Sequence, residues 1–398
     1  MMGRVQADCL ARAATTMPVV TVMGPRQSGK TTLVKATFPD HAYLSLELPE
    51  ERSEALQDPV GLLARFPDGA ILDEVQRAPE LLSYLQVEVD RDDRAGRWVL
   101  TGSQNLLLMR SVSQTLAGRT ALFTLLPLSL SELHGRSPLD LGALDRVDQA
   151  SLTGPPGELW QTLWAGFYPR IHDRGLEPRR WLADYHRTYV ERDLRDVLRV
   201  MDLVGFERFV RLAAARTGQE LNVASLAADA GISQPTAAQW LSALQTSYLI
   251  ALVQPYHKNY RKRLRKRPKL HFLDSGLACY LLDIRSPEIL QHHPLRGAIF
   301  ESFVAGELIK ASVHRGEEPA LHHWRDATGH EIDLIVELGE RQVPVEVKSG
   351  LTVADDALAG LQWWTDIADN PNRSGVLVHG GTVHRMRGNF CVRPWWIQ

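Results

Sequence analysis

The stretch GPRQSGKT, Gly24–Thr31, decides the fold of the first part of this chain. It fits the pattern G-x-x-x-x-G-K-[ST], in which the glycines let backbone N–H groups curl around phosphate oxygens. The apolar segment Val19–Met23 before it predicts a buried strand, and the segment Thr31–Thr37 after it predicts a helix. A strand, this loop and a helix N-terminus in that order predict a nucleotide-phosphate site.

Two carboxylates downstream extend this prediction. We expect Lys30 to reach the β- and γ-phosphates of ATP and the Thr31 hydroxyl to bind Mg²⁺. The segment AILDE, Ala70–Glu74, reads as an apolar strand that ends in two acids. Asp73 is expected to hold Mg²⁺ through water, and Glu74 to polarise the attacking water.

A further predicted strand ends in small polar residues, and any of Ser103, Gln104 or Asn105 could contact the γ-phosphate or the water. Arg119 is a candidate arginine finger and Arg110 is the alternative, while an exposed structural arginine is the competing interpretation of both. An arginine finger normally acts across subunits, so a ring or other homo-oligomer follows if Arg119 or Arg110 has that role. The predicted nucleotide-binding residues are Gly24, Pro25, Arg26, Gln27, Ser28, Gly29, Lys30, Thr31, Thr32, Asp73 and Ser103.

The composition of the whole chain limits the classes of protein it can belong to. Its 398 residues predict two to four domains, and 45 Lys+Arg against 47 Asp+Glu give a net charge of −2. This balance excludes a protein that is basic throughout but allows a local basic patch. Three cysteines without metal-ligand spacing predict a reducing, cytoplasmic location. No apolar run approaches the ~20 residues of a membrane span, so we expect no membrane partner.

Several sequence strings occur in a fixed order along the chain. They are GPRQSGKTTL, LDEVQRAPELL, LTGSQNLLL and LAGRTALFTLLPLSLSEL, followed by GFYPR (166–170), YVERD (189–193), KRPKLHFLDSGLACYLL (266–282) and GAIFESFVAGEL (297–308). This order resembles the AAA+-type P-loop ATPases that carry a C-terminal DUF4143 domain. The resemblance implies an α/β fold, a Mg²⁺-dependent ATP hydrolase, and ATP and Mg²⁺ as cofactors.

A second pattern lies in the middle of the chain. Residues 222–244 predict a helix, a tight turn at Gly231 and a second helix capped by Ser233, which is a helix-turn-helix pattern. The exposed face of the second helix is expected to include Gln234, Thr236, Gln239 and Trp240.

A basic strip follows this pattern. It contains Lys258, Arg261, Lys262, Arg263, Arg265, Lys266, Arg267 and Lys269. A strand pair carrying this strip would complete a winged helix whose basic side chains bind DNA phosphates. The alternative is a protein-interaction module with a solvated charge run.

The C-terminal region carries a third pattern. In the predicted strand 343–348, Glu346 and Lys348 are two residues apart and therefore share a face. Asp333 lies on the preceding predicted strand, and Glu301 lies on a predicted helix upstream. A helix Glu, a strand Asp and a Glu-x-Lys strand resemble the PD-(D/E)XK nuclease superfamily, although the Pro-Asp pair of its name is absent.

The resemblance implies a role for each of these residues. Asp333 and Glu346 would bind Mg²⁺ or Mn²⁺, Lys348 would orient the water or stabilise negative charge, and Glu301 would complete the metal's surroundings. Gln362, on the next predicted helix, lies where related nucleases often carry a polar site residue. The alternative is an inactive domain of the same fold in which Glu346 and Lys348 form an ion pair.

The expected architecture has four regions. They are a P-loop AAA+ ATPase core (1–130), a helical lid or connector (131–205), a winged helix-turn-helix with the basic strip (206–272), and a DUF4143 domain with a nuclease-like, restriction-endonuclease-like α/β fold (273–398). The main hypothesis is an ATP-hydrolysing protein that remodels or translocates on DNA in repair or recombination, with branched DNA such as a Holliday junction as a candidate substrate. The alternative is a nucleotide-dependent switch or scaffold whose winged helix binds protein and whose nuclease-like domain is inactive.

Overall fold

The computed structural model describes residues 2–103, 115–147, 154–188, 202–256, 267–326, 329–367 and 373–396. The chain divides into two compact units. Unit 1 contains Met1–Leu128 with two short later segments, Thr246–Tyr248 and Ser312–Glu318, and unit 2 contains the remainder. The finer division of unit 2 into connector, helix-turn-helix and C-terminal regions stays a prediction.

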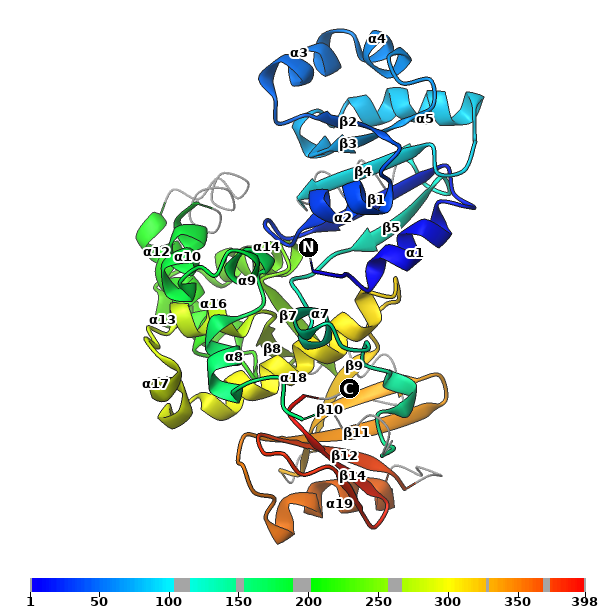
Figure 1. Cartoon of the computed structure of the whole chain (residues 1–398). Helices are drawn as coiled ribbons and strands as arrows, with labels where there is room; N and C mark the ends of the chain where they lie inside the picture. Colours follow the sequence, from blue (N-terminus) through cyan, green and yellow to red (C-terminus); the bar gives the residue numbers. More distant parts are fainter. Residues whose placement is uncertain are drawn as a thin grey trace. The chain divides into compact units, whose positions relative to one another are not determined.

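Unit 1 is built on a parallel sheet. Its strands are β1 (Val19–Gly24), β2 (Ala42–Ser45), β3 (Ala70–Asp73), β4 (Trp98–Ser103) and β5 (Thr120–Thr124). They lie in the order β2-β3-β4-β1-β5 and all the pairings are parallel, which confirms the α/β class expected for this region (Figure 1). Because the strands are parallel, β1, β3 and β4 all end at the same edge of the sheet.

Helices cover both faces of this sheet. They are α1 (Gln6–Ala13), α2 (Lys30–Thr37), α3 (Pro49–Gln57), α4 (Pro59–Ala64) and α5 (Leu81–Arg91). Val20 and Val22 of β1 belong to a core that includes buried side chains of α1 and α2, whereas Val19 and Met23 belong to one that includes those of α4 and α5. This alternation explains why β1 is apolar throughout and not only at every second position.

Within the described residues of unit 2, the strands form a nine-stranded mixed sheet in the order β13-β14-β12-β11-β10-β9-β7-β8-β6. The bounds are β6 (Gln219–Glu220), β7 (Ile250–Pro255), β8 (Lys269–Phe272), β9 (Leu321–Arg325), β10 (Glu331–Leu338), β11 (Arg341–Lys348), β12 (Gly375–His379), β13 (Arg385–Arg387) and β14 (Phe390–Pro394). The parallel pairing of β7 with β9 joins the three strands of the middle region to the C-terminal strands. The sheet is therefore continuous across both regions.

The helices of unit 2 are α7 (Leu130–His134), α8 (Leu159–Ala165), α9 (Pro169–Asp173), α10 (Pro178–Tyr185), α12 (Leu203–Ala214), α13 (Val223–Ala230), α14 (Gln234–Thr246), α16 (Ser275–Leu281), α17 (Pro287–His292), α18 (Arg296–Val313) and α19 (Ala359–Ile367). Most of them gather near β7 and β8, whereas α19 lies near β12 and β14 (Figure 1). Between α13 and α14, Gly231 adopts a left-handed conformation (φ 72°) and the Ser233 hydroxyl accepts a hydrogen bond from the Thr236 N–H, as the sequence predicts.

One residue of α14 differs from its expected place. Trp240 is buried, and its ring lies 5.1 Å from that of Phe206 and 5.3 Å from that of Phe209. The expectation that Trp240 lies on an exposed face was therefore wrong. Positions 237, 240, 241 and 244 follow the helical period and form one apolar stripe, so the indole belongs to the core.

Two distant sequence strings, GFYPR and the LDSG within KRPKLHFLDSGLACYLL, meet in unit 2. The carboxylate of Asp274 caps α16 and also accepts a hydrogen bond from the Phe167 N–H at 2.7 Å. A Cβ on Gly276 would lie 2.8 Å from the backbone of Gly166, which has φ 72°. This close approach of two backbones accounts for a glycine on each side.

Candidate functional site

The loop Gly24–Thr31 connects β1 to α2 at the carboxyl edge of the sheet. A Cβ on Gly24 would lie 2.2 Å from the carbonyl oxygen of Leu125, so only glycine fits there without a shift of the backbone. Gly29, directly before α2, has φ 95°, a conformation that also favours glycine. Both glycines of the motif are thus required by the path of the loop itself.

Lys30 is folded back onto this loop. Its Nζ donates hydrogen bonds to the carbonyl oxygens of Gly24, at 3.1 Å, and Pro25, at 2.9 Å. Burial lowers the pKa of Lys30 to about 8, although the nearby Glu74 and Asp73 oppose this effect. The side chain is therefore a poorly solvated cation, whose charge bound phosphates would stabilise.

The carboxylate of Asp73, at the end of β3, is surrounded by hydroxyl groups. Thr31 Oγ1 donates to its Oδ1 at 2.9 Å, Tyr43 Oη donates to its Oδ2 at 2.8 Å, and Thr101 Oγ1 also donates to Oδ1. These donors come from α2, β2 and β4. They fix the orientation of the acid that the sequence predicts to hold Mg²⁺.

Glu74 follows in a left-handed backbone conformation (φ 61°), which is uncommon for a residue other than glycine. The Ser103 hydroxyl donates to its carboxylate at 3.3 Å, and the Gln76 amide also donates to it. Strained backbone held by neighbouring contacts is common at functional sites. The structure therefore places Ser103 beside the predicted water-polarising acid, and contact of Ser103 with the γ-phosphate stays a prediction.

The loop and strand ends fit a Mg²⁺-nucleotide. Within the described residues, the buried Ser28 hydroxyl oxygen makes no hydrogen bond, which leaves a polar atom of the loop available to a ligand. The Lys30 ammonium lies against the loop, and the Thr31 hydroxyl lies against the Asp73 carboxylate. An ammonium, a hydroxyl and a carboxylate in this order are the groups that phosphate–Mg²⁺ binding requires.

The candidate arginine finger lies elsewhere in unit 1. Arg119 precedes β5, at the edge of the sheet opposite to the phosphate loop, and its backbone carbonyl accepts a hydrogen bond from the first residue of β1. Its guanidinium pairs with both carboxylate oxygens of Asp90, at 2.5 Å and 3.0 Å. This pairing favours the structural interpretation of Arg119, while Arg110, Gln104 and Asn105 lie outside the described residues.

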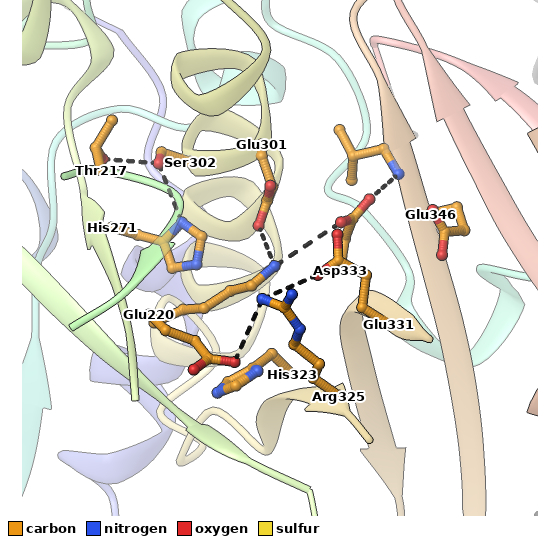
Figure 2. Close-up of polar contacts among 12 residues, drawn as sticks. Thr217, Glu220, His271, Glu301, Ser302, His323, Arg325, Glu331, Asp333 and Glu346 are labelled. Atoms are coloured by element: carbon orange, nitrogen blue, oxygen red, sulfur yellow. Dashed lines mark hydrogen bonds and ion pairs between the residues drawn. The ribbon is translucent and has the colours of Figure 1, made fainter. Parts of the chain in front are cut away.

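The predicted nuclease-like residues of unit 2 come together (Figure 2). Asp333 on β10 accepts a hydrogen bond from the Val347 N–H of β11 at 2.9 Å, which ties the two strands together. Lys348 Nζ lies 3.0 Å from Glu346 Oε2 and 3.9 Å from Asp333 Oδ2. Glu301, on α18, lies on the other side of Asp333.

Lys269 occupies the space between Glu301 and Asp333. Its Nζ lies 2.9 Å from Glu301 Oε1 and 3.8 Å from Asp333 Oδ1. Lys269 was expected to contact DNA with the basic strip, but it is 6% exposed and its ammonium faces these carboxylates. That expectation was wrong for Lys269, because its ammonium pairs with Glu301 and lies near Asp333 inside the protein.

The pKa values in this cluster follow from burial and charge. Burial, and next the neighbouring Asp333, raise the pKa of Glu301 and of Glu346 to about 8. Burial opposes ionisation of Lys269, but Glu301 and Asp333 raise its pKa. The lysines therefore keep their positive charges, and the glutamates are close to their titration range near neutral pH.

These residues do not fit a divalent metal. Among the residues that the structure describes, no group of three or more His, Cys, Asp or Glu side chains is placed to hold a metal ion. The ammonium of Lys269 lies where a cation shared by Glu301 and Asp333 would have to lie. Gln362 lies on α19 with its side chain exposed, and its backbone carbonyl accepts a hydrogen bond from the Thr365 hydroxyl at 2.8 Å.

Most of the basic strip, Lys258 to Lys266, lies outside the described residues. Arg267 is exposed, and its backbone carbonyl accepts a hydrogen bond from His323 at 3.1 Å. DNA contact by the strip therefore stays a prediction for every member except Lys269.

Sequence reasoning missed four residues that shape the two sites: Tyr43, Gln76, Thr101 and Lys269. Tyr43 and Thr101 lie near the carboxyl ends of the strands on either side of β3, and this position was the available signal. Lys269 was grouped with the basic strip, because the seven other cations of the strip directly precede it in the sequence.

Three family models match the chain. One described as an AAA domain matches residues 16–134, one described as a domain of unknown function, DUF8612, matches 157–288, and DUF4143, also a domain of unknown function, matches 296–397. Among the described residues, no helix combines the length and the apolar character that crossing a membrane requires.

Two curated relatives extend over most of the chain. They are uncharacterized proteins of Mycobacterium bovis (Mb2031c) and Mycobacterium tuberculosis (Rv2008c). Each is 32% identical over 345 residues, which cover 85% of this chain and 72% of the relative.

Similarities to solved structures are remote. The Walker-type ATPase PABY2304 of Pyrococcus abyssi has a TM-score of 0.45 at 15% identity, covering 69% of this chain and 94% of its own. The RuvB Holliday junction branch migration motor of Thermotoga maritima has a TM-score of 0.31 at 18% identity, covering 67% of this chain and 95% of its own.

Proposed function

Because the chain belongs to the family of AAA-type P-loop ATPases with a C-terminal DUF4143 domain, we propose that it couples Mg²⁺-dependent ATP hydrolysis to the binding of DNA. One observation supports the proposed ATP hydrolysis. Thr31 and Asp73, the predicted Mg²⁺ ligands, are in hydrogen-bond contact beside the buried Lys30.

Hydrolysis is favoured over phosphoryl transfer to a small molecule by the position of Glu74. Its carboxylate follows Asp73 directly and is held by Ser103 and Gln76 at the same edge of the sheet. A carboxylate in this place can accept a proton from a water molecule that attacks the γ-phosphate. Ser103 and Gln76 orient this carboxylate, and the roles of Arg119 or Arg110 in a homo-oligomer stay predictions.

DNA is the proposed partner of unit 2. The elements α12, β6, α13, α14, β7 and β8 follow each other in the chain, and the strands lie in the order β7-β8-β6. This arrangement supports the winged-helix interpretation, with the segment between β7 and β8 as the wing. That segment carries Lys258, Arg261, Lys262, Arg263, Arg265, Lys266 and Arg267, and no acid. DNA phosphates are the polyanion that such a loop would bind.

DNA cleavage is not part of the proposed function. The cluster of Glu301, Asp333 and Glu346 carries the PD-(D/E)XK pattern, but Lys269 stands among its acids. The contacts therefore favour an inactive nuclease-like domain, which is the second part of the alternative hypothesis. Remodelling of branched DNA remains a hypothesis for the ATPase.

The test measures ATP hydrolysis by the full chain with linear, single-stranded and four-way-branched DNA, and without DNA. We expect hydrolysis that requires Mg²⁺ and rises with at least one DNA form. The first variant replaces Lys258, Arg261, Lys262, Arg263, Arg265 and Lys266 by glutamine. It should keep basal hydrolysis, lose DNA binding, and reduce the slope of log affinity against log salt by about one for each DNA phosphate that the strip no longer neutralises.

A control variant replaces the same number of exposed arginines elsewhere by glutamine. Suitable positions are Arg91, Arg174, Arg180, Arg285, Arg373 and Arg385. It should bind DNA like the wild type, because its net charge changes equally but the strip is intact. Hydrolysis that no DNA stimulates, together with DNA binding that is absent or equal in both variants, would reject DNA as the partner. Protein partners of the helix-turn-helix would then be the remaining hypothesis.

A further inference from the structure

We propose that Lys269 is the built-in cation of the C-terminal carboxylate cluster, so that this cluster is complete without a metal ion. The proposal goes beyond ATP hydrolysis and DNA binding and does not depend on either. It concerns the Glu301, Asp333 and Glu346 side chains, which the sequence predicts to hold Mg²⁺ or Mn²⁺.

The acids and lysines of the cluster alternate in space. Lys269 Nζ lies 2.9 Å from Glu301 and 3.8 Å from Asp333, and Lys348 Nζ lies 3.9 Å from Asp333 and 3.0 Å from Glu346. The order is therefore Glu301, Lys269, Asp333, Lys348, Glu346. Each lysine lies between two acids, and Asp333 lies between two lysines. The two ammonium groups neutralise two of the three carboxylates without any metal ion.

Burial makes this neutralisation necessary. The side chains of Lys269, Asp333 and Glu346 are 7%, 9% and 7% exposed. Moving an unpaired carboxylate out of water costs roughly several kcal/mol of free energy. Buried acids therefore require a cation or a proton. A divalent metal is one solution, and the ammonium of a lysine is another. The structure contains the second solution between Glu301 and Asp333.

The groups around Lys269 are compatible with its positive charge. His271 is fully buried and lies two residues after Lys269 on β8. Its Nδ1 forms a hydrogen bond with the Ser302 hydroxyl at 3.0 Å, and that hydroxyl also forms a hydrogen bond with Thr217 (Figure 2). Burial, and next the charge of Lys269, lower the pKa of His271 to about 3, so the ring is neutral. Glu331 contributes a further negative charge near Lys269, and its carboxylate lies 3.9 Å from the Arg325 guanidinium.

Lys269 and the three acids come from different family regions of the chain. Glu301, Asp333 and Glu346 all lie within the DUF4143 region, 296–397, whereas Lys269 lies within the preceding DUF8612 region, 157–288. The ammonium is thus supplied from β8, outside the region that supplies the acids. The DUF4143 region by itself contains the acids without this partner, and its residue pattern alone therefore suggests a metal.

The proposal makes a specific prediction about the variant Lys269→Met. Methionine fills a similar apolar volume along the lysine stem but removes the ammonium. Lys348 still lies 3.9 Å from Asp333, but no cation then lies between Glu301 and Asp333. A hard divalent ion with oxygen ligands becomes the best replacement there. The variant is therefore expected to gain a Mn²⁺ site that the wild type lacks.

The experiment uses full-length protein in an Asp73→Asn background, without nucleotide, so that the phosphate-loop site does not contribute. Bound Mn²⁺ is counted by electron paramagnetic resonance, and the melting temperature is recorded with MnCl₂ and with EDTA. We expect no bound Mn²⁺ and equal melting temperatures with Lys269 present. With Lys269→Met, we expect one Mn²⁺ per chain and a melting temperature that rises with MnCl₂ concentration.

Two further variants make the result decisive. Lys269→Arg keeps a cation and should bind no Mn²⁺, and adding Asp333→Asn to Lys269→Met should abolish the gained site. A wild-type cluster that binds Mn²⁺ and loses it on Asp333→Asn would overturn the proposal. A folded Lys269→Met protein that binds none would also overturn it. If Lys269→Met does not fold, the measurement on the parent with and without Asp333→Asn still decides between ammonium and metal.

Discussion

Thr31 Oγ1 donates hydrogen bonds to both carboxylate oxygens of Asp73, at 2.9 and 3.1 Å. The contact joins the first turn of α2 to the carboxyl end of β3, although Thr31 and Asp73 are forty-two residues apart in the sequence. It means that the two predicted Mg²⁺ ligands are already adjacent in the fold. Binding of the ion therefore requires little movement of either side chain, which is the purpose of a rigid site.

The first prediction concerns the lysine of the phosphate loop. Lys30→Ala removes the ammonium that is expected to contact the β- and γ-phosphates, so the rate of ATP hydrolysis should fall by about 100-fold or more. The rate is measured by phosphate release at saturating ATP and Mg²⁺. Circular dichroism melting serves as the control, because unit 1 should stay folded. Hydrolysis by Lys30→Ala at the wild-type rate would mean that the phosphate loop is not the hydrolytic site.

The second prediction concerns pH. Since burial lowers the pKa of Lys30 to about 8, half of the ammonium groups have lost their proton at about pH 8 when no nucleotide is bound, and nearly all carry it below about pH 7. Bound phosphates stabilise the charge and raise this pKa, so binding takes up a proton. ATP affinity should therefore be constant below about pH 7 and weaken as the pH rises through about 8.

Isothermal titration calorimetry in buffers of different ionisation enthalpy measures this proton uptake directly. Lys30→Arg is the matched control, because a guanidinium stays charged over the whole range. An equal loss of affinity in Lys30→Arg would assign the pH effect to another group.

The third prediction concerns Tyr43, whose hydroxyl donates to Asp73 Oδ2 at 2.8 Å and whose ring lies 3.2 Å from the Lys35 ammonium. Tyr43→Phe keeps the ring but releases one oxygen of Asp73. Loss of one hydrogen bond to a charged group corresponds to about 1.5–3 kcal/mol. We expect the Mg²⁺ concentration for half-maximal hydrolysis to rise by about tenfold, with a smaller change at saturating Mg²⁺. Tyr84→Phe, on the exposed part of α5, should have no effect.

The fourth prediction tests the close approach of Gly166 and Gly276. Gly276→Ala places a methyl group 2.8 Å from the Gly166 backbone, so the two segments must separate. Overpacking of this kind lowers the free energy of unfolding by about 1–3 kcal/mol, measured by urea denaturation of the full chain. Gly154→Ala is the control, since its Cβ would meet no atom within 4 Å. Equal stability of the two variants would contradict this account.

Much of unit 1 could be predicted from the sequence, because local pattern and chemistry agree there. The apolar strand, the glycine-rich loop and the Asp73-Glu74 pair each have a short-range signature, and parallel strands bring their ends together. The strand position of Tyr43 was available from the sequence, but its contact with Asp73 and that of Gln76 with Glu74 could not be predicted. They depend on which hydroxyl or amide reaches a carboxylate in the folded protein, and sequence spacing does not determine that distance.

In unit 2, some predictions from the sequence are confirmed and others were wrong. Period two placed Glu346 and Lys348 on one face, and the helix-turn-helix spacing predicted Gly231 and Ser233, as the structure confirms. Lys269 and Trp240 were misjudged for a shared reason. Each was judged from polar or charged residues near it in the sequence. In the fold, Trp240 packs against Phe206 and Phe209, and the Lys269 ammonium lies among buried acids. The composition of a segment predicts its average exposure, whereas the contacts of each side chain decide whether that side chain is buried.

The ladder between β7 and β9 has a practical meaning for truncated forms of this protein. Gln254 and Pro255 are in register with His322 and His323, so the hydrogen bonds of one sheet cross the limit between the DUF8612 and DUF4143 regions. A fragment that begins at residue 296 would leave the β9 edge uncovered, and an uncovered edge pairs readily with other chains. Such a fragment would also lack the lysine that balances its acids. The two family regions thus share one sheet, and expression of either alone is expected to yield aggregates.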